Sequence, residues 1–152
     1  MNIYNRIFDD QKQLRIKLET MAIDMIFELI EKEQYQLCWS FMLEDENNDN
    51  PFLHRKSYIK KLSKICSISI APDLKIKVIA KEIMEKCNVR VKDALHLACA
   101  VNNKCENFIT CDDRLMRTLS SKESIIRPII GSTIIMNPVD FIRKELSIDG
   151  FE

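Results

Sequence analysis

The stretch from Val91 to Leu115 decides the fold, and it reads VKDALHLACAVNNKCENFITCDDRL. After Asp93 its first half is almost wholly apolar and lacks glycine and proline, which predicts a buried helix with an acid in the first turn. The β-prone run Phe108–Thr110 is followed closely by the acidic pair Asp112–Asp113. Carboxylates at the start of a helix and the end of a strand can meet at one edge of a parallel sheet, where α/β proteins bind ligands.

Composition restricts the class of protein. The chain has 152 residues, 46% of them hydrophobic and 30% charged, which is typical of one globular domain. The formal net charge is zero, so binding of nucleic acid would need a local basic patch. The six cysteines form no CxxC pair, which favours free thiols over a disulfide or zinc framework. No leader and no bilayer-length apolar run is evident, so we expect a cytoplasmic protein without a membrane segment.

Helical and β-prone segments alternate along the rest of the chain. Helices are expected near residues 11–33, 41–47, 54–64, 73–86, 114–120 and 139–146, and β-prone runs near 35–40, 66–71, 125–130 and 133–136. Strands separated by helices predict a parallel sheet covered on both faces. The expected fold class is therefore α/β with three α/β/α layers, formed by residues 1–152 as a single domain.

The pattern D-A-L-H-L-A-x-A followed by F-I-T-x-D-D-R-L resembles the second half of a PIN domain, the fold of VapC-type toxin ribonucleases. The resemblance implies an acidic site formed by Glu46, which follows Ser40 by six residues, together with Asp93 and Asp112, and with Asp113 as an auxiliary. In this family such acids bind Mg²⁺ or Mn²⁺ and cut RNA. The resemblance also implies a homodimer and a small antitoxin protein that blocks the site.

The residue types fit this chemistry independently of the resemblance. Hard divalent cations take oxygen ligands, and crowded carboxylates stay ionised together when a cation is near. A bound ion acidifies a water and stabilises charge on an attacked phosphodiester. Each acid also has a structural alternative: Glu46 lies in an acidic run typical of a solvated face, Asp93 could cap its helix, and one of Asp112–Asp113 would point to solvent.

Four basic residues bracket the acids in the sequence: Arg90, Lys92, Arg114 and Arg117. Basic side chains beside an acidic site would hold a phosphate backbone on either side of a cut, and ordinary surface charge is the alternative. His96 lies one turn from Asp93 on the same helix face, and we interpret it as a core histidine satisfied by a hydrogen bond.

The resemblance covers nearly the whole chain but lacks the strand that opens the family fold and the Asp at its end. The segment N-R-I-F-D-D, residues 5–10, resembles the N-R-P-F-D-D that follows this strand in relatives, with Ile7 in place of proline. In the family order 3-2-1-4-5 the absent strand is the central one. We therefore hypothesise that Met1 is an internal methionine of a longer product that supplies this strand and its Asp.

For the intact product, these observations lead us to expect a metal-dependent endoribonuclease of the toxin type. The 152-residue form would then cleave RNA weakly. One alternative is a catalytically impaired PIN-like module that binds nucleic acid or another protein. Another is metal-dependent cleavage of DNA, because carboxylate chemistry does not choose the sugar.

Overall fold

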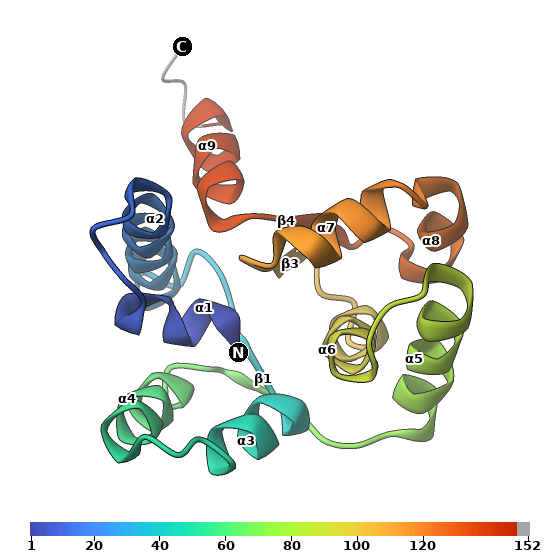
Figure 1. Cartoon of the computed structure of the whole chain (residues 1–152), viewed down its shortest axis with the longest axis horizontal. Coiled ribbons are helices and arrows are strands. Elements are labelled where there is room, and N and C mark those ends of the chain that lie inside the picture. The colour runs from blue at the N-terminus through green and yellow to red at the C-terminus, as the bar shows by residue number, and fades with distance from the viewer. Residues whose placement is uncertain (149–152) are drawn as a thin grey trace.

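The computed structural model describes residues 1–148 and shows helices surrounding short strands (Figure 1). The first part of the chain comprises α1 (Asn2–Asn5), the 3-10 helix η1 (Arg6–Phe8), α2 (Leu14–Glu31), β1 (Cys38–Ser40), α3 (Phe41–Asn48), α4 (Leu53–Ser63) and β2 (Ile68–Ile70). The second part comprises α5 (Leu74–Cys87), α6 (Val91–Asn102), β3 (Asn107–Ile109), α7 (Asp113–Ser120), α8 (Glu123–Ile130), β4 (Ile134–Met136) and α9 (Pro138–Ile148).

The strands form two parallel pairs. β1 pairs with β2 in the register Trp39 to Ser69, and β3 pairs with β4 in the register Phe108 to Ile135. Helices α3 and α4 connect the first pair and α7 and α8 connect the second, as parallel strands require a crossover. The expected α/β class with parallel strands is therefore confirmed. The structure differs from the expected single sheet, because within residues 1–148 the two pairs remain separate sheets.

Helix α6 lies at the centre of the largest core cluster. Ala94, Leu97 and Ala98 are fully buried, and they share this cluster with Ile83 of α5 and Ile126 of α8. The prediction of a buried central helix is confirmed, because its apolar run is enclosed by helices on several sides. Smaller clusters lie between α1, β1 and α4, and between α2 and α9. None of the helices in residues 1–148 is long and apolar enough to cross a bilayer.

The prediction of a β-prone run at residues 125–130 is wrong, because this segment forms helix α8. Ile126 and Ile130 lie four residues apart on one face and are buried in the core, whereas Ile125 is exposed. Burial of this helical face outweighs the preference of isoleucine for strands, which depends strongly on context. β1, β2 and β4 are shorter than expected, with β1 beginning only at Cys38, whereas β3 has the expected length and begins one residue earlier, at Asn107.

Candidate functional site

One arginine at the start of α6 contacts two of the predicted acids. Asp93 lies in the first turn of α6, and Arg90 is the N-cap residue with extended backbone. The Nε of Arg90 lies 3.2 Å from Asp93 Oδ2, and its Nη2 lies 3.6 Å from Asp112 Oδ2. The structure therefore brings Asp93 and Asp112 to the same guanidinium, although they come from different elements.

Asp112 is held by the turn between β3 and α7. It is the N-cap of α7, and its Oδ1 accepts a hydrogen bond of 2.9 Å from the backbone N–H of Leu115. The hydroxyl oxygen of Thr110 accepts a hydrogen bond of 3.1 Å from the backbone N–H of Asp112. A capping bond of this kind fixes the carboxylate, because the cap oxygen must face the first turn of the helix.

Asn2 attaches the N-terminal helix to this same turn. Its side-chain Nδ2 donates a 2.9 Å hydrogen bond to Thr110 Oγ1, and its Oδ1 accepts a 3.2 Å bond from the backbone N–H of Cys111. Helix α1 is thereby positioned at the end of β3. The Met1 amino group then lies 4.0 Å from Glu46 Oε2.

Glu46 reaches the site from α3. Ser40 caps this helix by accepting a hydrogen bond from Leu43 N–H, and Glu46 follows in the second turn. His96 Nε2 lies 3.2 Å from Glu46 Oε1 without hydrogen-bond geometry, so the hydrogen bond expected for this histidine is not formed at Nε2. Burial raises the pKa of Glu46, but His96, the Met1 amino group and Lys92 outweigh it and lower the pKa. His96 therefore faces the acidic site as well as being largely buried.

The three predicted acids, called here the acidic site, are related pairwise through cationic groups: Arg90 contacts Asp93 and Asp112, and the Met1 amino group lies near Glu46 and Asp93. Burial lowers the pKa of the Met1 amino group, and the nearby carboxylates of Glu46 and Asp93 oppose that shift. Among the described residues, however, no group of three or more His, Cys, Asp or Glu side chains is arranged to hold a metal ion. Carboxylate oxygens are the donor type that hard cations take, but the contacts of these acids in the structure are with the Met1 amino group and Arg90.

Asp113 does not join the acidic site. Its carboxylate pairs at the surface with Arg15 of α2 and not with Arg90. Lys92 is exposed at the start of α6 and acts electrostatically on Glu46. Arg114 and Arg117 are exposed on α7. Three of the four predicted basic residues thus lie at the surface on the two helices that carry Asp93 and Asp112, and Arg90 contacts these acids directly.

A buried charge network beside the site was not predicted from the sequence. The carboxylate of Glu19, whose side chain is only 2% exposed, pairs with Arg6 at 2.8 Å and with Arg15 at 3.0 Å. It also accepts a 2.9 Å hydrogen bond from the Asn137 side chain. The four-residue spacing of Arg15 and Glu19 was a detectable signal, but nothing in the local pattern indicated that Glu19 is buried.

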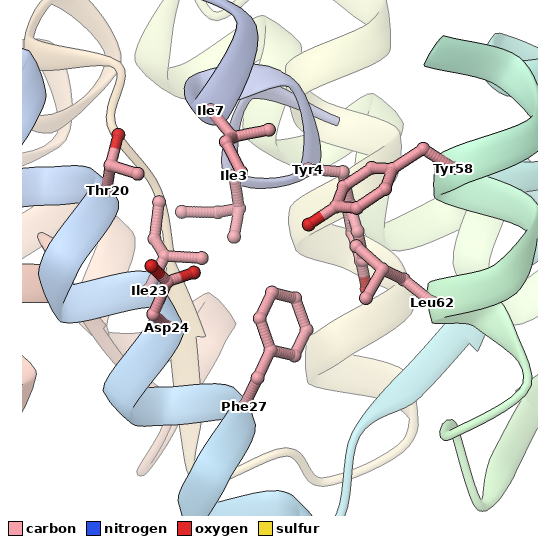
Figure 2. Close-up of a pocket in the computed structure, with 9 residues that line it drawn as sticks. All are labelled: Ile3, Tyr4, Ile7, Thr20, Ile23, Asp24, Phe27, Tyr58 and Leu62. Atoms are coloured by element: carbon pink, nitrogen blue, oxygen red, sulfur yellow. The ribbon is translucent and has the colours of Figure 1, made fainter. Parts of the chain in front are cut away.

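A cavity lies apart from the acidic site, between α1, α2 and α4 (Figure 2). Its lining is mainly apolar and includes Ile3, Phe27 and Leu62. Asp24 is the acidic residue of the lining, and burial raises the pKa of its carboxyl. Because an apolar hollow of this kind offers few polar groups to a ligand, we interpret it as a packing gap.

Comparison with known proteins identifies part of the chain. Residues 47–119 match the family model of the PIN domain. The PIN match includes Asp93, Asp112 and the whole of α6, and it begins one residue after Glu46. PIN domains are generally nuclease-type domains. No curated protein and no solved structure matches the chain.

Proposed function

We propose that the protein is a metal-dependent endoribonuclease that hydrolyses RNA phosphodiesters at the acidic site. The observation that carries this proposal is that Arg90, at the start of α6, contacts both Asp93 and Asp112, while His96, one turn after Asp93 on the same helix, lies 3.2 Å from Glu46. Two of these acids lie within the PIN match. Carboxylates gathered in this way are difficult to ionise together without positive charge, which a divalent ion would supply.

Each element of the site has a distinct role in this proposal. Glu46, Asp93 and Asp112 would hold Mg²⁺ or Mn²⁺, and Asp113, which pairs with Arg15, would take no part. When bound, such an ion acidifies a water and stabilises charge on the attacked phosphodiester. His96 keeps Glu46 ionised and oriented, and Thr110 orients the backbone of Asp112. The phosphates on either side of the cut would be bound by four basic residues: Arg90, Lys92, Arg114 and Arg117.

The test is cleavage of an end-labelled single-stranded RNA, with a DNA of the same sequence in parallel. We expect cleavage of RNA in Mg²⁺ or Mn²⁺ that stops when EDTA removes the ion, because the carboxylates alone cannot activate water. Cleavage that persists in EDTA would overturn the metal dependence. Cleavage of DNA at the same rate would make the protein a general nuclease.

The arrangement around Arg90 also favours a second candidate function. A guanidinium that already neutralises Asp93 and Asp112 suits a module that binds RNA without cutting it. Fluorescence anisotropy separates the two functions, because such a module would bind labelled RNA with no cleavage in any metal. Binding should weaken with salt, since phosphate contacts release counterions.

We also propose that the chain is one domain whose sheet is completed by a further strand between β1 and β3. Two separate parallel pairs, with the N-terminal segment between the ends of β1 and β3, support this arrangement. A central strand would pair backbone groups that are otherwise left to solvent or side chains. The upstream reading frame tests it: an in-frame stop codon without a coded strand and Asp would exclude the longer product.

The resemblance to VapC-type proteins supports a role as the toxin of a toxin–antitoxin pair that acts in the cytoplasm. A toxic ribonuclease should arrest growth when its gene is induced alone. Expression together with its antitoxin, a small protein that blocks the acidic site, should restore growth. Unimpaired growth with active ribonuclease in the cell would contradict the toxin role and leave the enzymatic proposal intact.

We propose that two copies pair through the exposed face of α2. Leu14, Leu18, Met21 and Met25 recur at spacings of four, three and four residues, and all are exposed, Leu14 at 71% and Met21 at 54%. This spacing forms one apolar stripe along a helix. The stripe is bordered by Lys17 near its start and by Asp24 and Glu28 near its end, so an antiparallel pair would place opposite charges together.

The substitution Met21→Glu tests this pairing. Met21 lies near the middle of the stripe, so a two-fold pair would bring two new carboxylates together in an apolar contact. We expect the dimer to weaken by more than about 10-fold, as measured by sedimentation equilibrium. Val78→Glu on α5, which changes another exposed apolar residue, should leave it intact. A wild-type protein that is monomeric at tens of micromolar would refute the pairing.

A further inference from the structure

Two cysteines from separate sheets meet in the structure. Cys38 is the first residue of β1 and Cys105 lies just before β3, 67 residues along the chain, yet their sulfur atoms are 3.6 Å apart. Both side chains are partly buried and neither is in a disulfide. To form a disulfide, the two sulfur atoms would move from 3.6 Å apart to the S–S bond length of about 2.05 Å, and this movement is shorter than the bond itself.

Backbone contacts hold both cysteines in place. Cys38 pairs with Ile68 in the β1–β2 ladder. Cys105 donates its backbone N–H to Ala100 O at 2.9 Å, and its carbonyl accepts a 2.9 Å bond from the Thr133 hydroxyl. The proximity of the two thiols therefore follows from anchored segments on both sides and not from a mobile loop.

The two thiols are electrostatically different. The hydrogen bond with Cys105 lowers the pKa of Cys38 to about 7, and raises that of Cys105. Burial raises the pKa of Cys66, Cys99 and Cys111 to about 11 in each case. Cys38 is therefore the cysteine with a substantial thiolate fraction at neutral pH among these five, and the thiolate is the reactive form.

We propose that Cys38 and Cys105 form a redox-active dithiol that closes to an intramolecular disulfide in the presence of a peroxide. The Cys38 thiolate attacks one peroxide oxygen, giving a sulfenic acid and releasing hydroxide. The Cys105 sulfur then displaces the sulfenic hydroxyl, and its proton leaves with that oxygen as water. In total two thiols and one hydrogen peroxide give one disulfide and two waters, with two electrons passed to the peroxide.

This bond would connect the two sheets covalently. β1 leads into α3 and Glu46, and β3 leads to Asp112, so the disulfide would fix the separation of the elements that carry these acids. The dithiol does not depend on the ribonuclease proposal, because neither sulfur takes part in the acidic site. Its closure would provide a covalent means of restricting movement between the two halves of that site.

The experiment treats the reduced 152-residue protein with one equivalent of hydrogen peroxide, alkylates the remaining thiols with iodoacetamide, and maps tryptic peptides by tandem mass spectrometry. We expect the peptide with Cys38 to be linked to Cys105 in most molecules. The peptide 105–114 also contains Cys111, so Cys111→Ser is the matched control and should keep the link, whereas Cys105→Ser should lose it. A link to Cys111 or Cys99, or no link, would overturn the proposal.

A second measurement needs no oxidation. We expect Cys38 of the native protein to be alkylated at pH 7 at least about 10-fold faster than Cys66 or Cys99, since lower thiolate nucleophilicity only partly offsets the larger thiolate fraction. Its rate should rise with pH to a half-maximum near 7. In Cys105→Ala the half-maximum should move upward by more than one pH unit. A profile that does not change in this variant would contradict the pairing of the two thiols.

Discussion

Asp93→Asn is expected to reduce metal-dependent RNA cleavage by more than about 100-fold, because it removes a charged oxygen ligand from the acidic site and keeps the shape of the side chain. The same substitution should change the free energy of unfolding by less than about 1 kcal/mol, since Arg90, the partner of Asp93 in this ion pair, is 67% exposed and stays hydrated without it. Initial rates at saturating Mn²⁺ and urea unfolding measure the two effects separately.

Asp73→Asn is the matched control for this prediction. Asp73 is also an aspartate at the start of a helix, where its carboxylate accepts a hydrogen bond from Lys75 N–H. It lies on α5 outside the acidic site, and asparagine serves equally well as an N-cap. Its cleavage rate should stay within about twofold of wild type. If Asp93→Asn cleaved as fast as Asp73→Asn, the acidic site would not be the site of RNA hydrolysis.

Glu19→Gln should lower the free energy of unfolding by about 3 kcal/mol, the largest stability change that we expect from a single conservative substitution. The carboxylate is almost fully buried between Arg6 and Arg15 and also receives the Asn137 amide. Removing the negative charge leaves the Arg6 guanidinium, whose side chain is only 16% exposed, without its buried charge partner and with only the more exposed Asp9 carboxylate, 2.8 Å away, to balance it. Breaking a buried pair from one side is costly for this reason.

Glu28→Gln on the same helix provides the control, because Glu28 is exposed and its pair with Lys32 spans 4.0 Å. Glu28→Gln should lower the free energy of unfolding by less than about 0.5 kcal/mol. The double variant Arg6→Gln with Glu19→Gln should be less destabilised than the sum of the single variants, since neither charge of the buried pair is left facing a neutral partner. Equal effects of Glu19→Gln and Glu28→Gln in urea unfolding would show that the network adds no stability.

The network is relevant to the site because of what it connects. Arg6 follows α1, which carries Asn2 to the β3–α7 turn, and Arg15 contacts both Glu19 and Asp113. Asn137 precedes α9, which packs against α2. The buried carboxylate therefore joins three segments that flank Asp112, and its loss should disturb the position of the β3–α7 turn.

Much of the fold could be predicted from periodicity alone. The apolar run after Asp93 specified α6 as a buried helix, and the helix expected near residues 11–33 corresponds to α2. These signals are local: each depends on residues within a few turns of one another. Residues 125–130 show where this reasoning fails. Their isoleucines favour a strand, but the segment is a helix because Ile126 and Ile130 then face the surrounding core.

The apolar stripe of α2 illustrates a second kind of failure. The sequence indicated one hydrophobic helix but not which of its apolar residues would be buried. In the structure Ala22, Ile23 and Ile30 face the core, and Leu14 and Met21 face solvent. An amphipathic pattern locates the apolar residues around a helix, whereas the elements packed against the helix select the face that is covered.

The sequence by itself determined the α/β class, the central helix with Asp93 at its start, and the strand that leads to Asp112, because each depends on a short pattern of polarity. Only the tertiary structure decided that His96 contacts Glu46, that Arg90 joins Asp93 to Asp112, and that Cys38 meets Cys105. These contacts bring together residues from separate elements. Their geometry depends on how helices and strands pack in three dimensions, which no local spacing of residues encodes.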